Sequence, residues 1–147
     1  MLKGIPSILS PDLLKILMEM GHGDTIVIAD GNFPSNTCAQ RIVRLDGHNV
    51  PEILKAILKL FPLDTYSEKP VSLMSVVPGD DVTPTIWDTY ETIIRNEFDK
   101  FTGFQFIERF AFYEKSKEAY AVIATSEKEL YANLILTKGI CWYTNYK

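Results

Sequence analysis

Residues 20–30 read Met-Gly-His-Gly-Asp-Thr-Ile-Val-Ile-Ala-Asp and join the end of a helix to an apolar strand. The Ile-Val-Ile centre is not interrupted by polar side chains, which predicts a strand covered on both faces. Glycines flank His22 ahead of this strand, and Asp30 follows it. Because histidine titrates nearest neutrality, His22 suits proton transfer. For the isolated motif, a plain turn with a surface histidine is the simpler interpretation.

Helix and strand patterns alternate along the rest of the chain. Ser10-Pro11-Asp12 supplies a capping hydroxyl, a proline and an acid for a helix start, and Gly21 is expected to end that helix. We predict helices over residues 11–20, 51–61, 84–98 and 110–117, and strands over 25–29, 41–45, 71–77, 104–107, 120–125 and 134–137. Residues 31–37 are expected to form a loop, and residues 126–132 a turn or short helix. The alternation predicts a single α/β domain over residues 1–147, with three layers (α/β/α) and a mostly parallel central sheet.

The composition is that of an ordinary globular protein. The chain has 147 residues, of which 46% are hydrophobic and 23% charged, and a formal net charge of −4. Lysines and arginines form no basic stripe, so nothing favours nucleic acid or an anionic membrane as a partner. No stretch reaches transmembrane length, and no signal peptide is recognised. Cys38 and Cys141 give neither a disulfide framework nor a zinc spacing, and we expect a cytoplasmic protein.

Most cofactor chemistries lack their motifs. Gly21-His22-Gly23 precedes a strand, whereas dinucleotide-binding loops open helices, and there is no Walker lysine or nucleophile elbow. A metal site would need carboxylates beside one histidine, so we predict no metal and no cofactor. Proton transfer without a cofactor remains, or no chemistry at all. We interpret His48, Asp80-Asp81 and the charged residues 114–118 as solvated surface.

Short landmarks keep a fixed order over residues 2–139. They include Gly4-Ile5-Pro6, Gly21-His22-Gly23-Asp24, Ala29-Asp30-Gly31-Asn32-Phe33-Pro34, Pro62-Leu63-Asp64-Thr65-Tyr66, Arg109-Phe110-Ala111-Phe112-Tyr113-Glu114 and Tyr131-Ala132-Asn133. In this order they resemble the family of L-fucose mutarotases and D-ribose pyranases. The segments over 63–66 and 109–114 are more similar to its fucose branch.

The resemblance implies an RbsD-like fold and an isomerase that interconverts the α and β anomers of L-fucose or related pyranoses. Opening the ring removes a proton from the anomeric hydroxyl and gives one to the ring oxygen, which requires an acid and a base near neutral pH. Two alternatives stay open: a D-ribose pyranase that interconverts ring sizes, and a non-catalytic sugar-binding oligomer. The resemblance also implies a homo-oligomer, a ring-shaped decamer or similar, with sites at subunit contacts.

The same resemblance implies roles for seven residues. His22 matches the proton donor, and Tyr131 is a candidate acid–base partner through its phenol. The candidates for substrate binding are Asp30, Asp64, Arg109, Tyr113 and Asn133. Structural interpretations stay open, with Asp30 as a strand-end cap, Arg109 paired with Glu108 or Glu114, Tyr113 in the core, and Tyr131 and Asn133 as turn formers.

Two features bear on whether these residues can form one site. Ala132 stands where the family commonly has glycine, and alanine would strain the loop if that position requires a positive φ. Thr25 and Asp30 are expected to lie roughly 16 Å apart, at ~3.3 Å per residue, and His22 precedes that strand. His22 can therefore reach Asp30 only if the glycines fold it back along the strand, or if two subunits share the site. We predict a shared site.

Overall fold

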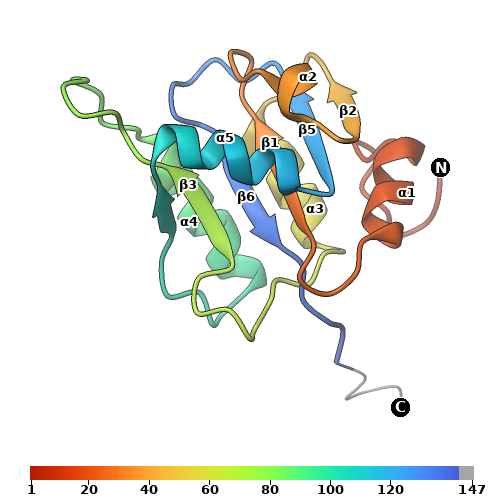
Figure 1. Cartoon of the computed structure of the whole chain (residues 1–147). Coiled ribbons are helices and arrows are strands. Elements are labelled where there is room, and N and C mark those ends of the chain that lie inside the picture. Colours follow the sequence, from red (N-terminus) through yellow and green to blue (C-terminus); the bar gives the residue numbers. More distant parts are fainter. Residues whose placement is uncertain (143–147) are drawn as a thin grey trace.

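The computed structural model describes residues 1–142, in which a six-stranded sheet lies between two layers of helices (Figure 1). The strands are β1 (Thr25–Ala29), β2 (Ile42–Leu45), β3 (Val71–Met74), β4 (Gln105–Ile107), β5 (Ala121–Thr125) and β6 (Leu134–Thr137). The helices are α1 (Pro11–Glu19), α2 (Ser35–Cys38), α3 (Val50–Leu58), α4 (Ile86–Glu97) and α5 (Arg109–Glu118). The strand order β2-β5-β1-β6-β3-β4 puts β1 and β6 in the middle of the sheet.

The sheet is mostly parallel, and β6 is the exception. Within the described residues, β2–β5, β5–β1 and β3–β4 are parallel pairs, whereas β6 is antiparallel to β1 and β3. The cause is the short connection from β5 to β6, because a parallel return needs a crossover of about a dozen residues or more. The predicted α/β class is confirmed. The reversal carries residues 131–133 to the edge of the sheet at which β1 and β3 end.

β1 is buried on both faces, as its Ile-Val-Ile centre predicts. Val27 belongs to an apolar cluster with Phe112 of α5, whereas Ile26 and Ile28 belong to a second cluster with residues of α1, α3 and α4. These three β1 side chains are fully buried, and each stabilises the fold by roughly 1.5–3 kcal/mol. In Figure 1, α5 crosses one face of the sheet, and α3 and α4 lie behind it.

The end of α1 differs from the prediction. Ser10 caps the helix as expected, with its hydroxyl accepting from the backbone N–H of Leu13 at 3.2 Å. Met20, however, is already extended (φ −65°, ψ 135°) and ends the helix. The glycine of this turn with a positive φ is Gly23 (86°) rather than Gly21. The turn therefore leaves His22 outside both the helix and the strand.

Two further differences from the prediction concern α2 and β3. The short helix α2 begins inside the predicted loop over 31–37, because a single turn of helix is too short to show a helical period. β3 ends at Met74 rather than Val77, since its pairing with β4 stops at Met74 and its pairing with β6 at Leu73. Residues 75–77 instead leave the sheet. Among the helices that the structure describes, none has the length and apolar character needed to cross a membrane.

Candidate active site

A cleft of about 340 Å³ opens where the parallel strands end. It lies beyond the carboxyl ends of β1 and β3, beside the first turn of α5 and at the start of β6. Crevices at the carboxyl ends of parallel strands commonly bind ligands, because the connecting loops converge there. Five of the seven predicted site residues line the cleft, namely Asp30, Arg109, Tyr113, Tyr131 and Asn133, together with Asn32, Phe33, Met74, Val77, Asp80 and Leu130.

Asp30 and Asn133 hold each other in this cleft. Both are buried, and the backbone N–H of Asp30 donates to Asn133 Oδ1 at 2.7 Å. Asp30 Oδ1 accepts from the backbone N–H of Asn32 at 3.0 Å. Burial raises the pKa of the Asp30 carboxyl, and hydrogen bonds from backbone amides and from Asn133 partly offset this rise. Asp30 thus caps the turn after β1, as its structural interpretation held, and also supplies a fixed carboxylate to the cleft.

Tyr131 has the one positive φ of any non-glycine residue among residues 1–142, at 57°. Two aromatic side chains of α4 hold this backbone: Trp87 Nε1 donates to the Tyr131 carbonyl at 2.8 Å, and Tyr90 Oη donates to the Ala132 carbonyl at 2.7 Å. Burial raises the pKa of Tyr90, which keeps its phenol a donor. Ala132 is fully buried and has no positive φ. Alanine is therefore unstrained at 132, and the strained position is Tyr131.

The phenol of Tyr131 binds the loop that follows β3. Its Oη accepts from the backbone N–H of Val77 at 3.2 Å and donates to the carboxylate of Asp80. The hydrogen bond to Asp80 raises the pKa of Tyr131. Asp80 is exposed, as its interpretation as solvated surface predicted, but its carboxylate also binds Tyr131 and lines the cleft. In the sequence, the Pro78-Gly79 turn directly after a predicted strand was the feature that could have indicated a role for Asp80.

Arg109 brings a positive charge to the same cleft. It is the first residue of α5, and its Nε donates to Tyr113 Oη at 3.1 Å, which raises the pKa of the guanidinium further. Within residues 1–142 no ion pair joins Arg109 to Glu108 or Glu114. Glu108 caps α5 instead, and Glu114 pairs with Lys117 at 2.8 Å. Tyr113 is half-buried rather than in the core proper.

A buried carboxylate that the sequence did not indicate, Glu127, supports the loop that carries Tyr131. Its Oε1 accepts from the backbone N–H groups of residues 128 and 129 at 2.9 and 3.0 Å, and its Oε2 from that of Val50 at 3.2 Å. The Glu127 carbonyl accepts from Gly31 at 2.9 Å. A Cβ on Gly31 would lie 3.1 Å from that oxygen. The loop is therefore tied both to α3 and to the residue after Asp30.

The other two predicted residues, His22 and Asp64, form a second group. His22 Nε2 lies 3.1 Å from Asp64 Oδ1, and its ring centre lies 5.3 Å from that of Tyr66. Asp64 Oδ1 also accepts from the Tyr66 backbone N–H at 3.0 Å. The His22 side chain is 44% exposed, whereas that of Asp64 is 10% exposed. A buried carboxylate therefore orients an accessible imidazole, which is the arrangement that a proton donor needs.

Lys138-Gly139, at the end of β6, brings these two loops together. The Lys138 carbonyl accepts from Gly23 at 2.8 Å, and Leu63 forms an isolated antiparallel bridge with Lys138. A Cβ on Gly139 would lie only 2.5 Å from the Leu63 carbonyl oxygen. The close approach of the two backbones therefore requires glycine at 139. It fixes Asp64 beside His22.

The two groups lie at opposite ends of β1. His22 precedes the strand and Asp30 follows it, and the five residues of β1 are extended between them. The glycines do not fold His22 back along the strand, since its partner is Asp64. One chain therefore brings five predicted residues together in the cleft and keeps His22 and Asp64 apart from them.

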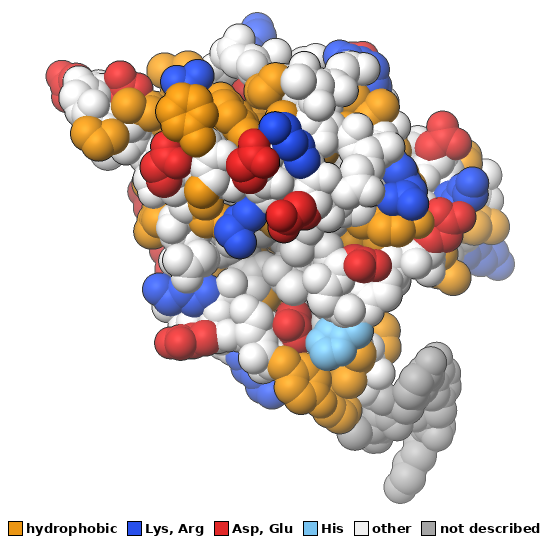
Figure 2. Space-filling model, in the orientation of Figure 1, with side chains coloured by type: hydrophobic (Ala, Val, Ile, Leu, Met, Phe, Trp, Pro, Cys, Tyr) orange, Lys and Arg blue, Asp and Glu red, His pale blue; other side chains and the backbone are white. Residues whose placement is uncertain are grey.

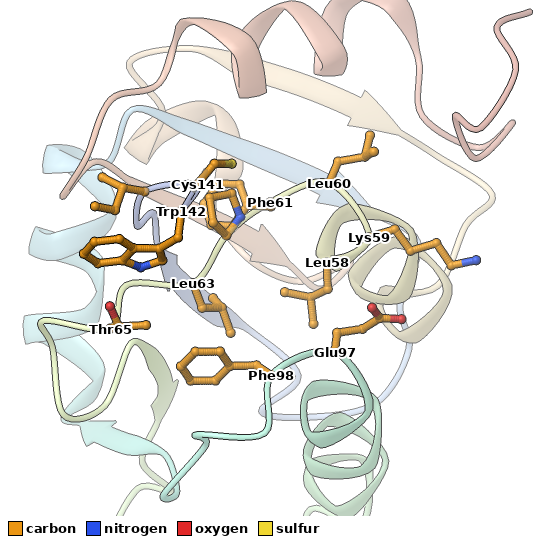
Figure 3. A pocket seen from close by; sticks show the side chains of 12 residues that line it. Leu58, Lys59, Leu60, Phe61, Leu63, Thr65, Glu97, Phe98, Cys141 and Trp142 are labelled. Atoms are coloured by element: carbon orange, nitrogen blue, oxygen red, sulfur yellow. The ribbon is translucent and has the colours of Figure 1, made fainter. Parts of the chain in front are cut away.

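A second cavity, of about 320 Å³, is mainly apolar (Figure 3). Leu58, Leu63 and Phe98 line it, with Lys59 and Glu97 as its charged members. None of the seven predicted site residues lines it. The cleft at Asp30 holds five of them in one volume with further carboxylate and amide side chains, so it is the candidate active site.

The surface carries charges of both signs. Acidic and basic side chains are interspersed over the face of the molecule shown in Figure 2. No group of three or more histidine, cysteine or acidic side chains within the described residues has a geometry that could hold a metal ion.

With this fold and cleft, the chain belongs to a known family of α/β proteins. Residues 3–141 match the model of the RbsD / FucU transport protein family, and the chain is a member of that family. A fucose mutarotase of Danio rerio is 49% identical over 145 residues, which are 95% of this chain and 94% of the relative.

Two solved structures have the same fold. The fucose mutarotase of Streptococcus pneumoniae, solved in complex with L-fucose, has a TM-score of 0.90 and 52% identity, and the match covers 96% of this chain and 100% of that one. FucU of Bifidobacterium longum has a TM-score of 0.93 and 55% identity, over 95% of this chain and 100% of that one. The predicted RbsD-like fold is confirmed by these matches.

Proposed function

We propose that this protein is an isomerase that interconverts the α and β anomers of L-fucose. One observation carries the proposal: the cleft gathers Asp30, Arg109, Tyr131 and Asn133 in a chain that is 52% identical to a fucose mutarotase solved with L-fucose. The full-length similarity to named fucose mutarotases favours this activity over the D-ribose pyranase and the non-catalytic oligomer. We also propose that residues 1–147 form one domain and that the protein is cytoplasmic.

The cleft suits a monosaccharide by its chemistry. A free sugar presents hydroxyls that both donate and accept, and the cleft offers a carboxylate, a guanidinium, a phenol and an amide within one volume. In this proposal Asp30 accepts from a sugar hydroxyl, while Arg109 and Asn133 donate to sugar oxygens. Hydrogen bonds that involve charged groups are about twice as strong as neutral ones, so Asp30 and Arg109 supply most of the orientation.

The proton for the ring oxygen comes from His22 in this proposal. Because His22 and Asp64 lie at the other end of β1, we place them against the Asp30 cleft of another copy of the chain. Asp64 holds Nε2 of the imidazole, and the 44% exposure of the His22 side chain leaves it accessible to a neighbouring copy. A ring-shaped homo-oligomer, a decamer or similar, would repeat this contact around the ring.

The activity is tested by saturation-transfer NMR on the purified protein. Irradiating one anomeric proton of L-fucose transfers saturation to the other when exchange is faster than the uncatalysed rate. We expect transfer with the wild-type protein and its loss in His22→Ala. Transfer only with D-ribose would support the pyranase, and wild-type transfer no faster than in buffer would refute catalysis.

The shared site is tested by mixing two variants that are each strongly impaired at L-fucose concentrations below the wild-type KM. Oligomers co-assembled from equal amounts of His22→Ala and Asp30→Asn chains would contain intact sites if each site takes His22 from one copy and Asp30 from another. Random assembly would then restore about one quarter of the wild-type sites. A site built within one chain would give every mixture only the average activity of the two variants, and this result would refute the shared arrangement.

A further inference from the structure

The loop between β3 and α4 places two groups on the Tyr131 phenol. Pro78-Gly79 forms its turn, with the Asp80 N–H donating to the Val77 carbonyl at 3.0 Å and Gly79 at a φ of 98°. Proline followed by a glycine with positive φ is typical of the centre of a type II turn. The two ends of this turn, the Val77 N–H and the Asp80 carboxylate, both bind Tyr131 Oη. The turn is thus a clamp for one oxygen atom.

This clamp gives the phenol a defined polarity. Tyr131 Oη donates its proton to Asp80 and accepts from Val77, so its remaining lone pair is available to a sugar hydroxyl in the cleft. Its carbonyl accepts from Trp87 of α4, and the following carbonyl, that of Ala132, accepts from Tyr90. The oxygen is therefore fixed from both ends of the residue.

We propose that Asp80 is the positioning residue that makes Tyr131 the proton acceptor for the anomeric hydroxyl of the sugar. As the anomeric O–H bond breaks, its proton goes to Tyr131 Oη, and the proton of Tyr131 moves to the Asp80 carboxylate. The electron pair of the O–H bond forms the carbonyl, and the bond from the anomeric carbon to the ring oxygen breaks. The ring oxygen takes a proton from His22, the acid of the proposed function. Closure on the other face reverses each transfer. This inference rests on the mutarotase activity proposed above.

Asp80 suits this role better than Asp30, the other carboxylate of the cleft. The Asp30 carboxylate accepts from the backbone N–H of Asn32, whereas the Tyr131 hydroxyl donates to Asp80, so the proton of Tyr131 has a direct path to Asp80. Asp80 is exposed and, among the described residues, receives a side-chain hydrogen bond from Tyr131 alone. A proton on Asp80 can therefore exchange with water between turnovers. Arg109 is close enough to Asp80 and Tyr131 for their charges to raise its pKa.

The test compares Asp80→Asn with Asp81→Asn, a matched control that removes the same charge from the next residue of the same exposed loop. Asparagine keeps an acceptor for Tyr131 but cannot take its proton. We expect kcat for L-fucose exchange to fall about 10- to 100-fold in Asp80→Asn, with KM within about twofold of wild type, since general acid–base steps contribute factors of this order or larger. Asp80→Glu should restore part of kcat, and Asp81→Asn should match wild type.

A double variant and a titration complete the test. If Asp80 acts through Tyr131, adding Asp80→Asn to Tyr131→Phe should cause no further loss of kcat. In ¹³C-tyrosine NMR, the resonance missing from Tyr131→Phe should titrate at lower pH in Asp80→Asn than in wild type. An Asp80→Asn protein with wild-type kcat, or with a change in KM alone, overturns the inference while the mutarotase activity stands. A wild-type protein that does not exchange L-fucose overturns both.

Discussion

Replacing Asp30 by asparagine separates the binding role of this residue from its structural role. Asp30 is only 6% exposed, and the side chains of aspartate and asparagine have nearly the same shape. Asparagine keeps one oxygen for the Asn32 N–H but turns an NH₂ group toward donors that now bind a carboxylate. The change therefore removes one charge and one acceptor without opening a cavity.

The expected magnitudes follow from these contacts. A hydrogen bond to a charged group contributes about 1.5–3 kcal/mol, so losing one to a sugar hydroxyl should raise KM roughly 10- to 150-fold. The free energy of unfolding should change less, because the lost hydrogen bonds are offset by the removal of a buried charge. We expect a net loss of about 0–2 kcal/mol, which lowers Tm by no more than about 8 °C in a chain of this size.

Saturation transfer over a range of L-fucose concentrations gives KM and kcat, and thermal unfolding gives Tm. Asp46→Asn is the control, because Asp46 is an exposed carboxylate paired with Arg44 at 3.0 Å, outside the cleft. We expect wild-type kinetics from it. An Asp30→Asn protein that keeps the wild-type KM while remaining folded would refute the assignment of Asp30 to the sugar.

Two further predictions concern stability. Burial raises the folded pKa of Asp30 above its ordinary value of 3.8, so its contribution to stability is fully present below that pH and is lost as the pH rises through the raised pKa. The Tm of wild type relative to Asp30→Asn should therefore increase between pH 7 and about pH 4, and a constant difference would contradict this. Ala132→Gly should lower the free energy of unfolding by about 1 kcal/mol, because Ala132 is fully buried and has no positive φ. Denaturant unfolding measures this loss, and a more stable variant would place the strain at 132 after all.

The sequence predicted elements best where local pattern decides them. The bounds of β1 and β6 match the prediction to the residue, since both are short apolar runs between turn residues. The direction of β6 was not predicted, although the short connection from β5 that causes it lies in the predicted turn or short helix over 126–132. The sequence did not predict α2, because a single turn is too short to show a helical period. The end of β3 was predicted too late, because the strand ends where its pairing with β4 and β6 stops.

The residues of the candidate site were likewise predicted only in part. Resemblance supplied five residues that the fold does bring into one cleft, although they come from distant parts of the chain. It also named His22 and Asp64 separately, and the fold places them in contact at 3.1 Å. The sequence did not indicate Asp80 and Glu127 as functional residues. A carboxylate in a turn is expected to be solvated, and only the fold shows which donors it contacts. The importance of both carboxylates comes from partners 51 or more residues away in sequence, at Tyr131 and Val50.

The backbone of Tyr131 shows why the Tyr-Ala-Asn segment alone does not define the site. A non-glycine residue with positive φ costs on the order of 1–3 kcal/mol, and glycine would remove that cost together with the phenol. The hydrogen bonds from Trp87 and Tyr90 contribute about 1 kcal/mol each, which is comparable with the strain. The conformation that aims Tyr131 at the turn over 77–80 therefore depends on two aromatic residues of α4, one of them fully buried. α4 thus belongs to the machinery of the cleft even though Trp87 and Tyr90 do not line it.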